Sequence, residues 1–489
     1  MRYLIAESIA LKPHLEIAAE IGLNELKRGN AVSFVWLGND LPWSDWELPP
    51  IARWVGCSLN RRIQSFEKLI AENGIKIIRN IDDERNWDEK IHKWAMSFNG
   101  TLNELQTYCY MNAPLGMGVA SSLISYTGNS NYNPLHDLDR TRKCLASALL
   151  VFLRIEKVIR VFNPDVVVTF NGRFATSKPI ITSAEAHGKK VLRHERGHTF
   201  THYEIFGDAI HNFDYIRQRI NQAWNIAESQ RRVLLGHEFF QRRRRGDGIG
   251  WYSFTGNQIR GQAPRRINKK KRIVYFSSSD DEFAAVTDAF KPGPWPSQLS
   301  AVNDLISVCS NIQHIELVIR VHPHLLKKSV ETQFQWKQMA SKHVKIINPA
   351  SKVDSYALMD SADIVITYGS TMGIEAVYWG KPSILLGPSS YRDSGVVLQP
   401  SDTKELLDMI VPDATLSIAS QESCLPYGFY YLSYGHKFIH YKPDSFSEGR
   451  LLGKRLGWDP SVIFFLRKIG LGKIYRKLMI GLNDQKNLK

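Results

Sequence analysis

The chain has 489 residues, a formal net charge of +15 at pH 7, 43% hydrophobic residues and 23% charged residues. This length is too great for one ordinary core and predicts about two to three domains, and the composition is that of a soluble globular protein. No run of eighteen apolar residues occurs, which argues against a membrane-spanning helix.

Charge and cysteine content narrow the class further. The excess of basic residues, 63 against 48 acidic ones, implies an acidic partner, and nucleic acid, anionic lipid and sugar nucleotide all satisfy it. The five cysteines are scattered without CxxC spacing, which favours a reducing cytoplasm and argues against structural zinc. The start MRYLIAES lacks the basic-then-apolar pattern of a signal peptide, so a cytoplasmic location is expected.

The N-terminal stretch predicts a β-α-β unit. Tyr3–Ala6 and Ala31–Leu37 are short apolar strands. Between them, apolar residues recur at helical spacing, and the helix is expected to stop at Lys27–Arg28–Gly29, where cationic residues precede a glycine. Such a unit is right-handed, with parallel strands. The following stretch, 42–132, is rich in Trp, Asn and short helical patterns, and we interpret it as a helical insertion.

The α/β alternation resumes after this insertion. The expected elements are a helix at Arg142–Val161, a strand at Asp165–Phe170, a helix at Ser177–Ala186 and a strand at Lys190–Arg193. A helix-rich connector, Asp214–Phe240, comes next. The composition then shifts, because Gln241–Lys271 combines Arg242–Arg245 with several glycines and a run of lysines. This shift is typical of an interdomain linker.

The second half of the chain repeats the alternation. Its predicted strands are Ile273–Phe276, Glu316–Val321, Lys345–Ile347, Ile364–Thr367 and Ser383–Leu386. Two such halves predict an α/β fold of two Rossmann-like, doubly wound domains facing a central cleft. We expect an N-terminal domain with a helical insertion over 1–245, a basic linker over 246–271, a C-terminal domain over 272–425 and a helical basic tail over 426–489.

Two of these strands run directly into clusters of small polar residues. In an open parallel sheet, ligands bind outside the carboxyl ends of the strands. A Gly/Ser/Thr-rich loop that enters a helix also presents backbone N–H groups to a phosphate. The sequence therefore predicts a nucleotide-sugar site, and its donor-binding candidates are Arg320, His322, Pro323, Ser370, Thr371, Gly373, Glu375, Ser278 and Ser279.

Each candidate has a chemical role and a plainer alternative. Arg320 and His322 would neutralise the donor phosphate, and His322 would also be catalytic by protonating the leaving phosphate oxygen; alternatively, His322 is satisfied by backbone. His324 is a less certain candidate beside it. Ser370 and Thr371 fit a phosphate nest, yet ordinary helix capping explains the same residues. Ser278 and Ser279 would line the site or cap a helix. The neighbouring acids 280–282 lack metal-cage spacing, so no metal is expected.

The C-terminal half resembles GT-B glycosyltransferases of bacterial surface polysaccharide assembly, in particular the capsule polysaccharide biosynthesis proteins. His322–Pro323 and Ser370–Thr371 are similar to the HP and Ser-Ser/Ser-Thr motifs of bacterial sialyl-, polysialyl- and Kdo transferases. In those enzymes both motifs hold the CMP part of a CMP-activated sugar acid. The run Gly373–Ala376 followed by Gly380–Pro382 is similar to the general GT-B donor signature, whose Glu, here Glu375, contacts the ribose. The resemblance implies no obligate Mg²⁺ and no other cofactor.

The N-terminal half offers candidates for the acceptor side. Glu195–Arg196–Gly197 resembles the motif that supplies a catalytic carboxylate in polysialyltransferases, although that motif has a second acid where Arg196 stands. Glycosyl transfer needs a base for the acceptor hydroxyl or a carboxylate nucleophile, and Glu195 is the candidate for either role. An ion pair with a flanking arginine is its alternative. Positioning candidates at the same strand ends are Asn171, Arg173, Arg193 and His194. His194 and His198 are also alternates for the role of Glu195, and Asp208 is a more distant one.

Two basic stretches point to a surface rather than to a site. Arg242–Arg245 lacks interleaved aromatic residues, so a solvated linker or lipid-facing patch is favoured over specific nucleic-acid binding. The tail after Asp459–Pro460 combines an apolar helix face with Lys473, Arg476 and Lys477. This composition is typical of an interfacial helix on anionic lipid, and packing on the N-terminal domain is the alternative.

These patterns lead to one functional hypothesis and three rivals. We expect a cytoplasmic glycosyltransferase, peripheral at the inner face of the plasma membrane, that builds capsule or lipopolysaccharide glycans. It would transfer a sugar acid such as Kdo from a CMP-linked donor to a glycan or lipid-linked acceptor. The alternatives are a UDP- or GDP-hexose transferase, a teichoic-acid-type glycerophosphotransferase, and a non-catalytic scaffold that binds polyanions through its charge.

Overall fold

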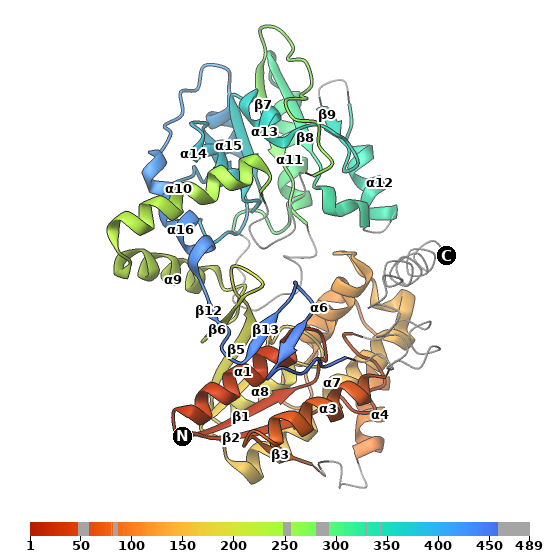
Figure 1. The fold of residues 1–489 in the computed structure, drawn as a ribbon. Coiled ribbons are helices and arrows are strands. Elements are labelled where there is room, and N and C mark those ends of the chain that lie inside the picture. Colours follow the sequence, from red (N-terminus) through yellow and green to blue (C-terminus); the bar gives the residue numbers. More distant parts are fainter. Residues whose placement is uncertain are drawn as a thin grey trace, which may run out of the picture. The chain divides into compact units, whose positions relative to one another are not determined.

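The computed structural model describes residues 1–46, 58–79, 81, 87–247, 256–279, 293–327, 330–341 and 344–457. The chain divides into two compact units, which Figure 1 shows along the colour gradient of the sequence. Unit 1 comprises Met1–Tyr126, Asn131–Ala209 and the segment from Gly435 onward, and unit 2 comprises Thr127–Ser130 and Ile210–Tyr434. No helix in the described part of the chain is both long enough and apolar enough to span a membrane.

Unit 1 is built on a seven-stranded sheet in the order β12-β6-β5-β4-β1-β2-β3. The strands are β1 (Arg2–Glu7), β2 (Ala31–Trp36), β3 (Lys76–Ile78), β4 (Val166–Phe170), β5 (Lys190–Arg196), β6 (His202–Phe206) and β12 (His436–Lys437). The first five are parallel, and β6 and β12 are antiparallel to their neighbours. The parallel part has the doubly wound order, with its topological switch point between β1 and β4.

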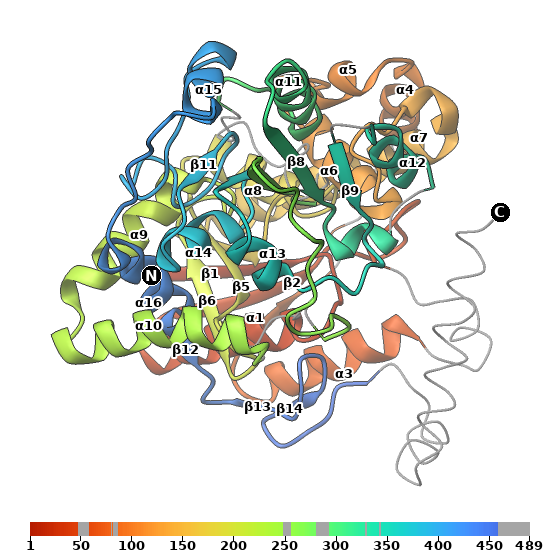
Figure 2. The same cartoon turned by 90° about the horizontal axis from the view of Figure 1, so that it is seen from above.

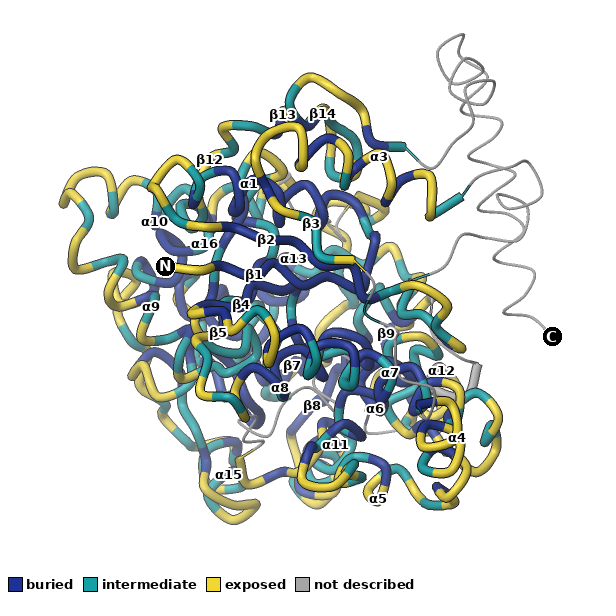
Figure 3. The backbone as a smooth tube through the Cα atoms, turned by 90° about the horizontal axis from the view of Figure 1, so that it is seen from below, coloured by how far each residue is buried: buried dark blue, intermediate teal, exposed yellow. Residues whose placement is uncertain are grey.

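Helices cover both faces of this sheet. They are α1 (His14–Lys27), α3 (Leu59–Ala71), α4 (Trp87–Ser97), α5 (Leu102–Gln106), α6 (Gly116–Thr127), α7 (Leu138–Phe162) and α8 (Lys178–Ala186). Side chains alternate between faces along a strand, so Ile5 packs in one cluster with α1 and α3 and Leu4 in another with α7 and α8. Both faces are therefore buried, and β1 and β2 are largely dark blue in Figure 3.

The described segment after Gly435 returns to unit 1 and adds β12 to the edge of its sheet. Beyond β12, β13 (Tyr441–Pro443) and β14 (Gly449–Leu451) form a small antiparallel pair. The buried Glu20 carboxylate of α1 accepts the backbone N–H groups of Ile439, His440 and Tyr441 at 2.7–2.9 Å. This segment is part of the N-terminal unit rather than a helical tail over 426–489. The tail helices expected after residue 458 lie outside the described residues.

Unit 2 contains a five-stranded parallel sheet in the order β11-β10-β7-β8-β9. Its strands are β7 (Lys271–Phe276), β8 (Ile315–Arg320), β9 (Val344–Ile347), β10 (Ile364–Thr367) and β11 (Ser383–Leu385). All five strands expected in the second half are confirmed within a residue or two. This is again the doubly wound order, with the switch point between β7 and β10. The expected α/β class with two Rossmann-like units is thereby confirmed.

Eight α-helices of unit 2 surround this sheet among the described residues. They are α9 (Phe213–Ile226), α10 (Ser229–Arg245), α11 (Gln298–Ser310), α12 (Val330–Gln338), α13 (Ser355–Asp360), α14 (Met372–Tyr378), α15 (Thr403–Ile410) and α16 (Leu425–Ser433). Helix α10 runs beside α16 (Figures 1 and 2). A Cβ at Gly428 would lie 2.5 Å from the Gly236 carbonyl oxygen, so these glycines permit the close approach.

The division into units differs from the expected boundaries. Unit 2 begins at Ile210 instead of after a linker at 246–271. Arg242–Arg245 is the last turn of α10, and Gly246 ends the helix in the left-handed conformation with a φ of +79°. Cationic residues followed by glycine are a helix stop signal. The arginine run and the glycine after it therefore mark the end of α10 and not the start of a linker. Residues 248–255 of the expected linker lie outside the described part.

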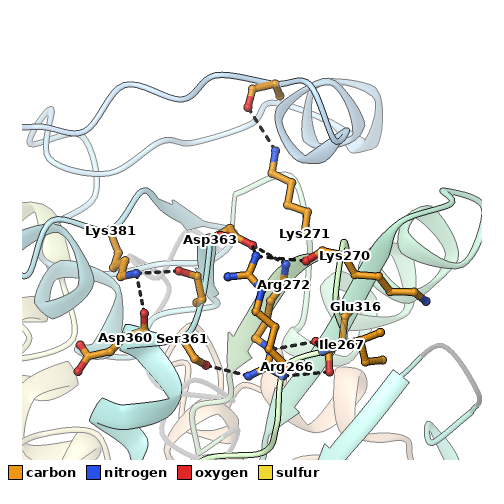
Figure 4. A network of polar contacts seen from close by, with 12 residues as sticks. Arg266, Ile267, Lys270, Lys271, Arg272, Glu316, Asp360, Ser361, Asp363 and Lys381 are labelled. Atoms are coloured by element: carbon orange, nitrogen blue, oxygen red, sulfur yellow. Dashed lines mark hydrogen bonds and ion pairs between the residues drawn. The ribbon is translucent and has the colours of Figure 1, made fainter.

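A buried ion pair ties the amino-terminal ends of the unit 2 strands together (Figure 4). Arg272 of β7 donates to both oxygens of Glu316 on β8, at 2.9 and 3.2 Å. The Arg272 side chain is fully buried, and its remaining N–H groups donate to the Pro264 carbonyl and the Ser361 hydroxyl. Charges out of water require such complete partnering. This network lies at the edge opposite to the predicted donor site and has a structural role.

Candidate functional site

The donor-site candidates of unit 2 gather at the carboxyl edge of its sheet. Phe276 on β7 is in register with Arg320 on β8 and with Thr367 on β10. The polar residues that follow these strands therefore begin at the same level. His322 follows β8 and Ser370 follows β10, the two strands that flank β7, and both residues are half-buried. They share one edge and remain accessible, as a common ligand site requires.

The histidine after β8 is held in a defined orientation. The His322 backbone N–H donates to Ser277 Oγ at 2.8 Å, and the His324 backbone N–H donates to His322 Nδ1 at 3.2 Å. Because Nδ1 accepts this bond, the hydrogen of a neutral His322 ring must reside on Nε2. His322 thereby offers a ring N–H donor. His324 Nδ1 is 3.4 Å from Ser279 Oγ, so this pair links the ends of β7 and β8.

The backbone of Ser278 is held by Gln298, the first residue of α11. Its backbone N–H donates to Gln298 Oε1 at 2.6 Å, and its carbonyl accepts from Gln298 Nε2 at 3.2 Å. Its hydroxyl oxygen is buried and has no hydrogen-bond partner among the described residues. The expected capping role concerns a helix after residue 279, which lies outside the described part. Ser278 therefore contributes a rigid backbone beside the site.

The loop after β10 is ordered by its own hydrogen bonds and by Tyr391. Ser370 Oγ accepts from the Met372 N–H at 3.4 Å, and the Ser370 carbonyl accepts from the Tyr391 hydroxyl at 2.5 Å. The cap residue of α14 is Thr371, whose side chain makes no capping hydrogen bond. A Cβ at Gly373 would lie 2.6 Å from the Tyr391 hydroxyl. Gly373 is therefore required for the packing of Tyr391, whereas Ser370 and Thr371 are half-buried at the edge.

Glu375 does not have the expected ribose-binding environment. Its side chain is fully buried, and Oε1 accepts from Arg243 Nε at 2.7 Å. Oε2 accepts from the Tyr356 hydroxyl in a short hydrogen bond. Both oxygens are occupied by protein groups, so the structure assigns Glu375 to an internal ion pair instead. Sequence reasoning missed Arg243 because it lies on α10, within the run interpreted as a linker.

Arg320 likewise differs from its expected role. Its guanidinium is buried at the end of β8 and donates to the carbonyls of Asn348 and Ser351, at 2.5 and 3.2 Å. Burial lowers the pKa of Arg320 to about 10. The side chain holds the loop after β9. Its Nη1 and Nη2 donate to backbone oxygens, and its buried Nε has no hydrogen-bond partner among the described residues. Pro323 begins the short 3-10 helix Pro323–Lys327, which turns the chain away after His322.

Glu195 of unit 1 lies on β5 at the carboxyl edge of that sheet, and its side chain is 22% exposed. Asn171 Nδ2 donates to Oε2 at 3.1 Å, and the Arg196 backbone N–H donates to Oε1 at 3.0 Å. His14 Nδ1 is 3.7 Å from Oε1. The Arg193 guanidinium donates to Glu185, and Arg196 Nη2 donates to the Lys12 carbonyl. Glu195 is oriented, accessible and next to an imidazole.

Two acid–histidine contacts at this edge were not predicted: His14 with Glu195, and His194 with Glu7. His194 Nε2 is 2.6 Å from Glu7 Oε1, and both side chains are almost completely buried. Burial raises the pKa of Glu7, partly offset by His194. Burial also lowers the pKa of His14 well below its usual value, with Arg196 adding to the effect. The signal was available in Glu7 at the end of the first strand and in His14 at the start of the next helix.

The other acceptor-side candidates have structural partners. Arg193 is buried and donates to Glu185 at 3.0 Å and to the Gly207 carbonyl at 3.3 Å. His194 is inaccessible because of its buried pair with Glu7, so it does not face an acceptor. Arg173 donates to Ser121 Oγ at 3.3 Å and lies over the Phe174 ring. Of the alternates, His198 packs on the His202 ring and Asp208 caps its own loop.

Asn171 is the positioning residue that the structure supports. It has a left-handed φ of +54°, which asparagine tolerates better than most residues. Gly172 follows with a φ of +90°, and a Cβ there would lie 1.9 Å from Ile181 Cδ1. This tight turn after β4 directs the Asn171 amide towards Glu195. Asn171 and Glu195 therefore belong together, as the sequence predicts, while Arg173 and Arg193 do not join them.

Comparison with known proteins identifies the family of one segment. Residues 251–430 match the family described as capsule polysaccharide biosynthesis protein. The resemblance of the C-terminal half to capsule polysaccharide biosynthesis proteins is confirmed over this segment, which contains the His-Pro and Ser-Thr motifs. A search among curated proteins gives no match.

Solved structures of low similarity include two of KpsC from Thermosulfurimonas dismutans. Its beta Kdo 2,4 transferase is 13% identical, with 55% of this chain and 79% of that chain covered and a TM-score of 0.35. Its beta Kdo 2,7 transferase is 15% identical, with coverages of 65% and 89% and a TM-score of 0.34. The UDP-GlcNAc 2-epimerase of Neisseria meningitidis is 12% identical, with coverages of 88% and 97% and a TM-score of 0.24. At these scores, the fold assignment rests on the strand orders above.

Proposed function

Because residues 251–430 form a segment of the capsule polysaccharide biosynthesis family, we propose that this protein is a glycosyltransferase of capsule or lipopolysaccharide assembly. It transfers a sugar acid, such as Kdo, from a CMP-linked donor to a glycan or lipid-linked acceptor. It requires no metal ion for the transfer. The donor binds at the carboxyl edge of the unit 2 sheet, and Glu195 of unit 1 acts on the acceptor side.

One observation carries the donor part of this proposal. An oriented imidazole, His322, and a half-buried hydroxyl loop, Ser370–Thr371, lie at the same carboxyl edge on either side of the first strand of a doubly wound sheet. This is the position at which such sheets bind nucleotides. The Nε2–H of His322 and the loop hydroxyls are donors, and phosphate oxygens are acceptors.

The transfer step moves the sugar from the donor phosphate to the acceptor hydroxyl. The bond between the anomeric carbon and the phosphate oxygen breaks, and its electron pair leaves with CMP, whose phosphate is stabilised by His322. In one version Glu195 takes the proton from the acceptor hydroxyl, which attacks the anomeric carbon. In the other, the Glu195 carboxylate attacks the anomeric carbon as CMP leaves and forms a glycosyl ester. The acceptor hydroxyl then attacks the same carbon, and the released Glu195 carboxylate takes up the hydroxyl proton. Either version uses the accessible, oriented carboxylate of Glu195.

Thermal-shift and calorimetric titrations with CMP, UDP, GDP and CDP-glycerol test the donor class. We expect CMP to stabilise the protein, and H322A to weaken CMP binding while the melting temperature without ligand stays near that of the wild type. H440A, on the C-terminal segment of unit 1, is the matched control. Stabilisation by UDP alone would replace the CMP-linked donor by a hexose donor.

Two rival functions have their own discriminating observations. A teichoic-acid-type glycerophosphotransferase is disfavoured because Thr367–Tyr368–Gly369–Ser370 stands where that class has Asp-Tyr-Ser-Ser. Stabilisation by CDP-glycerol alone would nevertheless select it. A polyanion-binding scaffold is suggested by the net charge of +15. Salt-sensitive binding to random DNA without any nucleotide-induced shift would favour this scaffold.

Membrane association is proposed from charge and composition. The basic chain would be drawn to the anionic inner leaflet, where lipid-linked acceptors lie. Removal of Trp458–Lys489 should release the protein from anionic vesicles while turnover of a soluble acceptor persists. Vesicle binding that is unchanged by this truncation would assign the interaction to another part of the chain.

A further inference from the structure

Arg243 connects helix α10 to the hydroxyl loop after β10. Its Nε donates to Glu375 Oε1 at 2.7 Å, and its Nη2 donates to Thr371 Oγ1 at 2.9 Å. Glu375 is fully buried, whereas 35% of the Arg243 side chain is exposed. One guanidinium therefore joins a buried carboxylate to a half-buried hydroxyl at the edge where the donor is expected.

The direction of the Thr371 contact has a chemical consequence. A hydroxyl has one hydrogen and two lone pairs, and the guanidinium occupies a lone pair of Thr371 Oγ1. The hydroxyl hydrogen stays available for an acceptor. Since successive hydrogen bonds polarise one another, a hydroxyl that accepts from a cation is also a stronger donor. A phosphate oxygen is the matching partner for it.

Arg243 is fixed in this place and remains charged. A buried carboxylate needs a counter-charge, and Glu375 has Arg243 and the Tyr356 hydroxyl as partners. The guanidinium carbon also lies 5.7 Å from the centre of the Phe239 ring. Burial alone would lower the pKa of Arg243, but the adjacent Glu375 carboxylate raises it overall.

We propose that Arg243 is a positioning residue for the nucleotide-sugar donor, because it orients the Thr371 hydroxyl to donate its hydrogen to a donor phosphate oxygen. This inference rests on the proposed function and assigns how its donor site is organised. Arg243 precedes the segment 251–430 that matches the family. Arg320 was expected to supply a cation for the donor phosphate, but its Nη1 and Nη2 donate to backbone carbonyls. Arg243 supplies a cationic group at the loop after β10 instead.

The test is a double-mutant cycle on CMP binding, measured by isothermal titration calorimetry. R243K keeps the charge but cannot make both contacts, and T371V removes the hydroxyl at nearly constant size. We expect each variant to weaken CMP binding about tenfold, which is the effect of one charge-assisted hydrogen bond. The double variant should bind no more weakly than T371V, because Arg243 acts through that hydroxyl.

Two further variants separate positioning from a general structural role. T371S keeps the hydroxyl and should bind CMP like the wild type, and R243K should again cost about tenfold in that background. R242K is the matched control, because Arg242 pairs with Glu238 on the same helix at 2.9 Å and contacts no loop residue among the described contacts. It should bind CMP like the wild type.

The outcomes distinguish this inference from the proposed function. If the wild type binds CMP and R243K binds it equally well, or if the losses of R243K and T371V multiply, the positioning role is refuted while the proposed function stands. If the wild type binds UDP, GDP or CDP-glycerol instead of CMP, the same double-mutant cycle with that nucleotide tests the positioning role of Arg243. A wild type that binds none of the four refutes the proposed function and this inference together.

Discussion

Glu195 combines a fixed orientation with access to solvent. Asn171 and the Arg196 N–H hold its two oxygens, and its side chain is 22% exposed. A base or nucleophile needs this combination, because a fixed geometry lowers the barrier only if the substrate can reach the group.

We therefore expect E195Q to lower kcat about 10²- to 10⁴-fold, the usual effect of losing a general base. CMP binding should be unchanged, because Glu195 belongs to unit 1 and the donor residues to unit 2. Single-turnover transfer and calorimetry measure the two effects. E185Q is a suitable control, since Glu185 pairs with Arg193 and its side chain is 54% exposed. An E195Q variant with most of its activity would exclude this carboxylate as the acceptor-side group.

His14 gives unit 1 a pH-dependent stability. Its pKa lies well below the usual 6.5 because of burial, so the folded ring stays neutral at a pH where the unfolded ring binds a proton. The unfolded state then binds more protons, and stability falls as the pH drops below about 6.5. Glu7, whose pKa is raised by burial, acts in the opposite direction.

The contribution of His14 to the pH dependence of stability is therefore measured by comparing H14Q with the wild type. We expect the free energy of unfolding of H14Q to change less between pH 7 and pH 5 than that of the wild type, in urea titrations at each pH. The exposed His136 provides the control variant H136Q, which should retain the wild-type slope. A wild-type slope in H14Q would show that other groups cause the acid sensitivity.

At the residue scale, the sequence predicts which side chains stand at the strand ends but not what they contact. His322, Ser370, Thr371 and Glu195 are placed as the strand pattern requires. Glu375 was assigned to a ribose because its partner Arg243 lies 132 positions away on another helix. Burial and side-chain pairing of this kind depend on tertiary packing, which hydrophobic periodicity does not encode.

At the scale of elements, the sequence predicts all five strands of unit 2, including the three-residue β11, but not β3 and β6 of unit 1. All five strands of unit 2 are nearly continuous apolar runs because helices bury both faces. In unit 1, β3 has three residues, and β6 contains His202 and Glu204 among its five. Such segments lack a clear periodicity. Helix α10 was cut short in the prediction because four arginines at its end read as a linker.

The Arg272–Glu316 pair at the amino end of β7 and β8 stabilises unit 2 through complete burial. Removing one partner leaves an uncompensated charge, so R272M should destabilise unit 2 by about 3–5 kcal/mol. The double replacement R272M/E316L should regain much of this loss, because two apolar groups of similar volume need no counter-charge. Urea unfolding followed by circular dichroism measures both. R266M, which removes a more exposed partner of Asp363, should cost far less.

For the whole molecule, the main feature is that the chain returns to unit 1 after completing unit 2. Residues after Gly435 complete the sheet of the N-terminal unit, and Arg62, paired with Glu16, also donates to the Leu456 carbonyl at 2.6 Å. The Glu20 carboxylate receives three backbone N–H groups from this segment. A segment that would pass for a tail is thus a component of the first unit.

Loss of the Glu20 acceptor should loosen this segment specifically. E20A leaves three backbone N–H groups without their acceptor, at a cost of about 1–3 kcal/mol for each one that stays buried. We expect faster proteolytic cleavage after residue 435, measured by limited proteolysis and mass spectrometry, with nucleotide binding by unit 2 unchanged. E72A, on the exposed Lys454 pair, is the control. Equal cleavage rates in E20A and the wild type would contradict this role of Glu20.

The position of β12 after unit 2 in the chain also determines when the sheet of unit 1 can be completed during translation. Strand β6 acquires its outer neighbour β12 only after the whole of Ile210–Tyr434 has left the ribosome, which takes roughly ten seconds or more at about 5–20 residues per second. Throughout that interval β6 is an open edge of a partly assembled sheet, the type of surface on which nascent chains aggregate. The sheet of unit 1 is thus completed only after unit 2 has been synthesised.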